Sequence, residues 1–287
     1  MIEYQQTVRL PVYYTKYKIA EYLLEDIPDG DKTTEAIFTE KDSITAVIQA
    51  EEEIVFVGNQ IFNYFFDDTF KTGLYFTDGQ IVKKDEIIGL ISGRPDLILS
   101  RERVLLNILQ RLCGIATLTK KYVDIAKPYG VKILDTRKTT PGLRLFEKYA
   151  VVVGGGYNHR MDLSSGILIK DNHIKAAGSI REAIKKVKEY NKEKLPVEIE
   201  VETIEEIIEA LSVGVDGFLL DNMNRDKIIE CVELVRREKD GDDIFLEASG
   251  GITLDNLKEY VDTGINAISS GELTHSVKSS EIHIEFL

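Results

Sequence analysis

Cysteine and long apolar runs are scarce in this sequence of 287 residues. The two cysteines, Cys113 and Cys231, lie in apolar, helix-like contexts without metal-ligand spacing, so we expect two buried thiols and no disulfide. No apolar run approaches the ~20 residues that a membrane-spanning helix needs. The opening residues also lack the basic start and apolar core of a signal peptide. The sequence therefore predicts a cytoplasmic protein with no membrane partner.

Positive charge is scarce overall but concentrated in one part of the chain. The net charge is −13, yet residues 101–175 contain fourteen Lys or Arg against six Asp or Glu. A protein that binds a nucleic-acid duplex needs a broad basic face. This distribution therefore favours a small polyanion over nucleic acid as the ligand. A solvated basic face is the alternative that composition alone leaves open. Because 43% of the residues are hydrophobic, the chain can form a substantial core.

The first 115 residues differ in pattern from the rest. Short alternating segments at 43–57 and 73–93 predict strands, and 98–128 predicts a helix that is interrupted near Gly114. We therefore expect an N-terminal α/β sandwich domain with a linking helix over 1–115, a catalytic α/β barrel over 116–275, and a segment over 276–287 that returns to the first domain.

From residue 131 onward, apolar runs alternate with amphipathic segments. Continuous apolar runs are typical of parallel strands covered on both faces. They lie at 131–135, 166–170, 197–201, 217–221, 244–249 and 266–270, with a candidate seventh at 150–154. Helix N-caps are expected at Ser179, Thr203 and Thr253, and helix-ending glycines at Gly214, Gly241 and Gly264.

Polar residues follow these predicted strands in register. They are Lys138, Lys170, Glu200, Asp221, Ser249 with Gly250, and Gly271. In a barrel of parallel strands the carboxyl ends meet in one ring, where barrel enzymes carry their active sites. The sequence thus predicts an open α/β barrel of about six or seven parallel strands.

Two of these strand ends carry glycine turns, EASGGI (247–252) and SSGEL (269–273). Bare backbone amides at such turns bind phosphate in barrels, although ordinary tight turns would have the same sequence. Glu200 and Asp221 end neighbouring strands and are candidates to hold Mg²⁺ or to stabilise a cationic sugar. Salt bridges to nearby lysines are the alternative for both carboxylates.

Candidate functional side chains are most concentrated in the three segments DTRKTTPGLR (135–144), GGGYNHR (154–160) and LIKDNH (168–173). Arginine forks suit planar carboxylates, whereas lysine suits phosphate. The cationic candidates are Arg137, Lys138, Arg144, His159, Arg160 and Lys170, and His275 lies at another polar strand end. His173 is expected to be structural. The residues alone predict a barrel enzyme that binds phosphate at one side of its mouth and carboxylate at the other.

In this order and spacing, the motifs resemble those of quinolinate phosphoribosyltransferase. They are ERVLLNILQRLCGIAT, DTRKTTPGLR, GGGYNHR, LIKDNH, EIEVE, LLDN, EASGGI and GELTHS, and the resemblance covers roughly residues 20–276. It implies phosphoribosyl transfer from 5-phosphoribosyl-1-pyrophosphate to quinolinate, with decarboxylation to nicotinate mononucleotide. It also implies Mg²⁺ with the donor, no tightly bound organic cofactor, and a homodimer or a hexamer of dimers.

The resemblance also implies roles for single residues. Thr136, Arg137, His159 and Arg160 would bind quinolinate, and Arg103 would reach the quinolinate of the partner subunit. Lys138, Lys170, Glu200 and Asp221 would be catalytic, the two carboxylates also positioning Mg²⁺. The donor's 5′-phosphate would lie against Ser249, Gly250, Gly251, Ser270, Gly271 and Glu272.

One motif departs from the family pattern. Members usually show HR-x-GL-x-D, whereas this chain has HRMDLSSG, with Asp162 in place of glycine. The entry segment EDIPDGDKTT (25–34) resembles a relative associated with molybdate transport operons. A paralogue of that type acting on another aromatic acid, or a non-catalytic regulatory relative, is therefore the alternative prediction.

Overall fold

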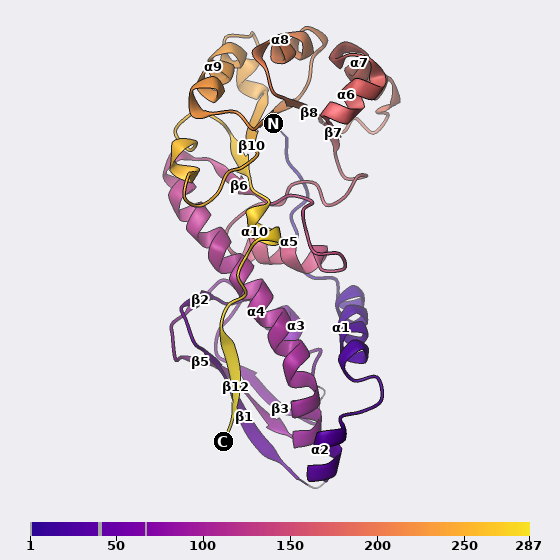
Figure 1. Ribbon diagram of the computed structural model, residues 1–287, viewed down its shortest axis with the longest axis vertical. Helices are drawn as coiled ribbons and strands as arrows, with labels where there is room; N and C mark the ends of the chain where they lie inside the picture. The colour runs from indigo at the N-terminus through magenta and orange to yellow at the C-terminus, as the bar shows by residue number, and fades with distance from the viewer. Residues whose placement is uncertain (1, 40–41, 67) are drawn as a thin grey trace. The chain divides into compact units, whose positions relative to one another are not determined.

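The computed structural model of the chain describes residues 2–39, 42–66 and 68–287 (Figure 1). It contains two compact units, each built from three separate segments of the sequence. One unit comprises residues 2–6, 121–140 and 156–275, and the other comprises 7–120, 141–155 and 276–287. No helix within the described ranges combines the length and apolarity needed to cross a membrane.

The unit around residues 156–275 contains a parallel sheet of six strands, ordered β6-β11-β10-β9-β8-β7. The strands are β6 (Lys132–Leu134), β7 (Ile167–Ile169), β8 (Val197–Val201), β9 (Gly217–Asp221), β10 (Phe245–Ser249) and β11 (Ala267–Ser269). The predicted parallel sheet is thus confirmed, and each expected apolar run from 131 onward contains one strand. The sheet ends at β6 and β7, so the barrel is open.

Helices and 3-10 turns precede, connect and follow these strands (Figure 1). They are α6 (Asp171–Ala177), α7 (Ile180–Tyr190), α8 (Ile204–Val213), α9 (Arg225–Arg236) and α10 (Glu272–His275), with the 3-10 turns η1 (Lys127–Tyr129), η2 (Gly241–Asp243) and η3 (Leu257–Glu259). Ser179 and Thr203 cap α7 and α8 as predicted. Gly214 ends α8 at φ +88°, also as predicted.

Three local predictions in this unit are wrong. Thr253 opens only turns and η3: its carbonyl oxygen accepts the Leu257 N–H at 2.9 Å, but the segment continues as the 3-10 turn η3 and not as an α-helix. Gly241 lies in η2, where an added Cβ would meet the Val235 carbonyl oxygen at 2.0 Å. Gly264 has φ +89° but follows a turn and not an α-helix.

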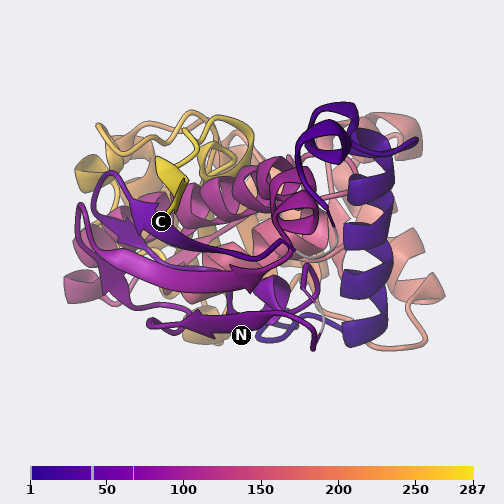
Figure 2. The same ribbon diagram turned by 90° about the horizontal axis from the view of Figure 1, so that it is seen from below.

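The other unit has a four-stranded antiparallel sheet, ordered β12-β1-β5-β3, and a small two-stranded sheet. The strands are β1 (Ile44–Ala50), β3 (Lys71–Leu74), β5 (Ile87–Gly93) and β12 (Ile282–Phe286), with β2 (Ile54–Val55) paired to β4 (Ile81–Val82). Figure 2 shows β12, the last strand of the chain, beside β1, to which it pairs along its length.

Helices of this unit are α1 (Val12–Asp26), α2 (Lys32–Ile37), α3 (Asn59–Phe62), α4 (Pro95–Ala126, whose last turns belong to the barrel unit) and α5 (Arg144–Val153). The candidate strand at 150–154 is wrong, because these residues end α5. Phe146, Tyr149 and Ala150 are buried on that helix, so packing prevails over the β-propensity of the valine run.

The predicted interruption of α4 at Gly114 is also wrong, since the helix runs through it. A Cβ at Gly114 would lie 2.3 Å from the Lys278 carbonyl oxygen. Glycine thus lets the returning chain approach the helix, which offsets its roughly 1 kcal/mol helix cost. Both cysteines are buried and free, as predicted. The boundaries expected at 115 and 275 stay a prediction.

Candidate active site

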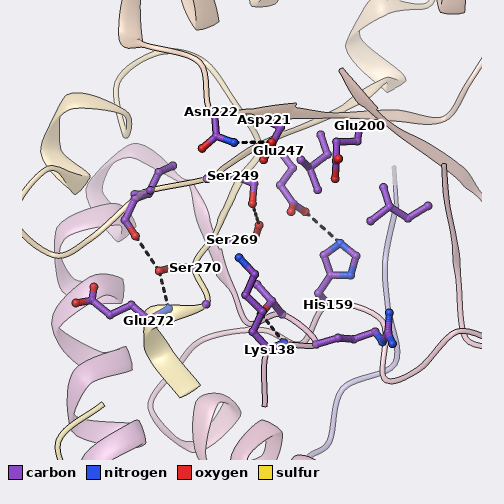
Figure 3. Close-up of a pocket in the computed structure, with 18 of the residues that line it drawn as sticks. Lys138, His159, Glu200, Asp221, Asn222, Glu247, Ser249, Ser269, Ser270 and Glu272 are labelled. Atoms are coloured by element: carbon purple, nitrogen blue, oxygen red, sulfur yellow. Dashed lines mark hydrogen bonds and ion pairs between the residues drawn. The ribbon is translucent and has the colours of Figure 1, made fainter. Parts of the chain in front are cut away.

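A cavity of about 610 Å³ lies at the carboxyl ends of the barrel strands (Figure 3). It is lined by Thr136, Arg137, Lys138, His159, Arg160, Leu168, Lys170, Glu200, Leu219, Asp221, Asn222, Glu247, Ser249, Gly250, Gly251, Ile252, Thr253, Ser269, Ser270, Gly271, Glu272 and His275. Parallel pairing aligns the strand ends, so residues distant in sequence meet here. Apart from Arg103 and Arg144, the structure brings together every cationic, carboxylate and glycine-turn residue that the sequence analysis assigned to the site.

Two glycine turns form one wall of the cavity. Gly250 and Gly251 follow β10 with φ +92° and +63°, conformations that favour glycine. The Ser269 hydroxyl donates to the Ser249 hydroxyl at 2.9 Å and so links the ends of β10 and β11. The Ser270 hydroxyl donates to the Ile252 carbonyl oxygen at 2.8 Å, which connects the two turns. The wall therefore exposes backbone amides beside short hydroxyl side chains.

Lys138 reaches this wall from the turn after β6. The Thr136 hydroxyl accepts the Lys138 N–H at 3.0 Å, and Thr274 donates to the Lys138 carbonyl oxygen at 2.8 Å. A Cβ at Gly271 would lie 2.9 Å from the Lys138 side chain and 2.7 Å from the His275 ring. Glycine at 271 therefore leaves room for a lysine beside the amide-rich wall.

Carboxylates and a lysine occupy the ends of β7, β8 and β9. The Lys170 ammonium donates to Glu200, forming an ion pair at the mouth. Asn222 donates its side-chain amide to Asp221 at 2.6 Å. Burial, followed by the charge of Glu200, raises the pKa of Asp221. Two neighbouring carboxylates are hard oxygen ligands, and a divalent cation between them would relieve this repulsion, so these residues fit Mg²⁺.

Two arginines and a histidine supply the opposite wall. Arg160 is buried and donates to the Gly166 carbonyl oxygen at 3.0 Å. Burial, and then the charge of Arg137, lower the pKa of Arg160. The buried Nε of Arg137 has no hydrogen-bond partner within the described residues. Two guanidinium groups close enough to repel one another suit a ligand that carries more than one carboxylate.

His159 sits over two buried glutamates that the sequence analysis did not place in the site. Its Nε2 lies 3.5 Å from Glu198 and 3.7 Å from Glu247, and both glutamates are completely buried. Figure 3 shows the contact with Glu247. Burial raises the pKa of Glu247 to about 7, although the neighbouring His159 acts to lower it. Tyr4 donates its hydroxyl to Glu198 at 2.8 Å, and burial followed by Glu198 raises the pKa of this phenol.

The ligand atoms of His159, Glu198 and Glu247 lie within 4.8 Å of one another, as in a metal site. However, His159 Nδ1 accepts the backbone N–H of Arg160 at 2.7 Å. Nδ1 therefore carries no proton, and the neutral ring holds its proton on Nε2, facing the carboxylates. Metal ligation through Nε2 would require loss of that proton as well. We conclude that this cluster of three side chains holds protons and does not form a metal site.

Three other sequence candidates, Arg103, Arg144 and His173, are not among the residues that line the cavity. Arg103 is exposed on α4, in the unit that contains residues 7–120, and is not among the lining residues. His173 accepts the Lys170 N–H at 2.9 Å and caps α6, which confirms its predicted structural role. Glu247 was missed, although a carboxylate inside the apolar run IFLEAS was a visible signal. Asn222 and Ser269 lie in the motifs LLDN and SSGEL but were not assigned to the site.

The fold and cavity together define an α/β-barrel protein with its site at the carboxyl ends of the strands, where barrel enzymes act. Models of the quinolinate phosphoribosyl transferase N-terminal and C-terminal domains match residues 31–113 and 115–285. The chain therefore belongs to the quinolinate phosphoribosyltransferase family.

Individual relatives agree with this assignment. A probable carboxylating nicotinate-nucleotide pyrophosphorylase of Bacillus subtilis is 45% identical over 273 residues, covering 94% of this chain and 92% of the relative. A chloroplastic counterpart in Arabidopsis thaliana is 40% identical over 297 residues, covering 96% and 83%. The solved nicotinate-nucleotide pyrophosphorylase of Francisella tularensis superimposes with a TM-score of 0.92 at 34% identity, covering 99% of this chain and 100% of that one. The molybdate-type and non-catalytic alternatives are not favoured.

Proposed function

We propose that the protein transfers the phosphoribosyl group of 5-phosphoribosyl-1-pyrophosphate to quinolinate, with loss of CO₂, to give nicotinate mononucleotide and pyrophosphate. The relatives' names support this activity. The observation that carries it is the division of one cavity into two chemically different walls. Arginines line one wall, and glycine turns with lysines and carboxylates line the other.

Quinolinate, an aromatic acid with two carboxylates, fits the arginine wall. Arg137 offers a buried guanidinium nitrogen without a protein partner within the described residues. Arg160 is anchored through one nitrogen to Gly166, which fixes the direction of its fork. Bidentate contacts from such forks would orient the ring so that its nitrogen faces the donor. Thr136 and His159 complete this wall.

The donor fits the other wall. Its 5′-phosphate would accept hydrogen bonds from the amides of Gly250, Gly251 and Gly271 and from the Ser249 hydroxyl, with Ser270 and Glu272 at the rim. Lys138 and Lys170 would bind the pyrophosphate, while Glu200 and Asp221 would hold the ribose and Mg²⁺. When bound, Mg²⁺ would offset the negative charge of the pyrophosphate. A cation is favoured here because burial and Glu200 already raise the pKa of Asp221.

Charge placement explains the chemistry. As the bond between C1 of the ribose and pyrophosphate breaks, the ribose becomes oxocarbenium-like, and the carboxylates of Glu200 and Asp221 stabilise it. The lysines stabilise the departing anion, while the quinolinate nitrogen donates its electron pair to C1. The ring nitrogen is then cationic, so CO₂ leaves from the adjacent carbon and the resulting carbanion takes a proton from water. Positioning supplies most of the rate enhancement.

The direct test is an assay of purified protein with quinolinate, the donor and Mg²⁺, measuring CO₂ release and nicotinate mononucleotide together. We expect both products in equal amounts, and neither without the donor. A matched reaction with nicotinate should give no turnover. Turnover of nicotinate without turnover of quinolinate would refute the proposal.

We further propose a homodimer, or a hexamer of such dimers, in which Arg103 completes the partner's site. The support is the family resemblance and the exposure of Arg103, which has no hydrogen bond or ion pair within the described residues. The test combines two inactive variants, Arg103→Ala and Lys170→Ala. If Arg103 acts in trans, a mixed dimer has one intact site and regains activity. If confirmed mixed dimers stay inactive, the shared site is refuted.

The domain limits at 115 and 275 and a cytoplasmic location also remain proposals that rest on the sequence. Limited proteolysis followed by mass spectrometry tests the limits, since cleavage is expected to concentrate in exposed connections between domains.

A further inference from the structure

The segment Ile2–Gln6 packs against residues of the barrel strands. Ile2 is 3% exposed and packs in a core cluster with Leu134, Phe245 and Ala267. Gln6 donates to the Asn158 carbonyl oxygen at 3.2 Å, and its own side-chain oxygen accepts the Asn158 N–H at 2.7 Å. These contacts fix the segment next to the two residues that precede Arg160.

Tyr4, between these two anchors, packs against His159, which lines the cavity. Its ring stacks on His159, with the centroids 4.5 Å apart and the planes 23° apart. Its hydroxyl donates to Glu198. A Cβ at Gly166 would lie 2.6 Å from the Tyr4 ring, so glycine at 166 leaves room for it. Tyr4 does not line the cavity itself.

One face and both ring nitrogens of the His159 imidazole are therefore defined. Tyr4 covers one face, Nδ1 accepts the Arg160 N–H, and Nε2 faces Glu198 and Glu247. Arg160 is the next residue in the chain, and its N–H donates to the imidazole. The orientation of the imidazole therefore fixes the backbone position from which the Arg160 side chain extends. Asp135 fixes the other side of the turn by accepting the His159 N–H at 2.9 Å.

We infer that Tyr4 is a positioning residue for the aromatic acid: by stacking on His159 and donating to Glu198, it holds the neutral, Nε2-protonated imidazole that orients Arg160. This inference rests on the proposed function for its kinetic effect, but its structural part does not. It assigns to residues 2–6 a role in substrate selection at a site formed by the barrel strands.

The test compares Tyr4→Phe and Tyr4→Leu with a matched control in the same unit, Tyr190→Leu, where the native side chain is 86% exposed. Tyr4→Leu removes both the stack and the hydrogen bond, so the quinolinate KM should rise about tenfold, with the donor KM within about twofold. Tyr4→Phe keeps the stack and should rescue part of this loss. Tyr190→Leu should change neither KM.

A second measurement follows the imidazole directly. Nitrogen-15 NMR of histidine-labelled protein, with His159 assigned from a His159→Gln sample, reports which ring nitrogen carries the proton. We expect the Nε2–H form in the native chain and a mixture of forms in Tyr4→Leu. Should Tyr4→Leu fail to fold, Tyr4→Phe supplies both readouts with a smaller shift.

The outcomes separate the two proposals. If native protein turns over quinolinate but both Tyr4 variants keep its KM, the inference is overturned and the function stands. An equal rise of both KM values also overturns it, because a general structural defect would act in that way. If native protein does not turn over quinolinate, the proposed function is refuted. In that case the NMR measurement still tests the inference, and an unchanged His159 signal in Tyr4→Leu would overturn it.

Discussion

Two adjacent glycines in the turn after β10 allow one prediction to be worked out with its own control. Gly250 has φ +92°, and an added Cβ would lie 2.4 Å from Asn222 Oδ1 and 2.8 Å from the Asn222 backbone nitrogen. Gly251 has φ +63°, and nothing lies within 4 Å of its added Cβ. The same substitution to alanine therefore produces strain alone at 251, and strain plus collision at 250.

The magnitudes follow from these two terms. Gly251→Ala should cost about 1 kcal/mol of folding free energy, the strain of a left-handed alanine. Gly250→Ala carries at least that strain and adds overpacking of about 1–3 kcal/mol. The collision cannot be relieved by a side-chain rotation alone, because the backbone of Asn222 is involved. Its N–H also donates to the Ser249 carbonyl oxygen at 2.9 Å, so moving it would disturb the turn.

Urea unfolding of both variants beside the native chain measures this difference. We expect Gly250→Ala to lose about 2–4 kcal/mol and Gly251→Ala about 1 kcal/mol. Gly250→Ala should also raise the donor KM, because Asn222 donates to Asp221 and would carry it out of place. Equal losses of stability in the two variants would refute the reasoning from the turn geometry.

Three further predictions concern charged side chains of the site. Lys170→Ala should lower kcat/KM about 100-fold or more at saturating Mg²⁺, whereas a loss below about tenfold would make Lys170 only a structural partner of Glu200. Arg137→Lys or Arg160→Lys should raise the quinolinate KM about tenfold and leave the donor KM nearly unchanged, because lysine lacks the fork; equal weakening of both substrates would contradict the assignment of this wall. Burial raises the pKa of Glu247 to about 7, so folding stability from this group should be present at acidic pH and be lost as pH rises through about 7. Unfolding of Glu247→Gln between pH 4.5, the ordinary glutamate pKa, and about pH 7 should show a flatter profile than the native chain, and an unchanged slope would contradict the shift.

Strand positions and strand-end residues could be predicted because both depend on local pattern. Apolar runs of about one strand's length repeat at the spacing of β-α units, and parallel pairing brings their ends together. Lys170 and Asp221 were predicted from this register alone. The pairing Ser249–Asp221 between β10 and β9 shows the alignment directly.

The failures share a different cause, which is packing between distant segments. The valine run before Gly154 has strand propensity, but contacts with other parts of its unit hold it as a helix. Gly114 looked like a helix breaker because the carbonyl of Lys278 that approaches it cannot be seen in sequence. Tyr4 and Glu198, separated by 194 positions, give no local sign that they form a hydrogen bond.

Pairing of β12 with β1 has a consequence for how the chain is made. Ala46 pairs with Phe286, so β1 is synthesised about 240 residues before its edge partner. Until then one edge of an apolar strand, Ile44–Ala50, is open to other chains emerging nearby. Closing so long a loop is slow compared with local pairing. Productive synthesis therefore depends on shielding that edge during translation, and a chain truncated before residue 282 would remain prone to aggregation even though its catalytic barrel sequence is intact.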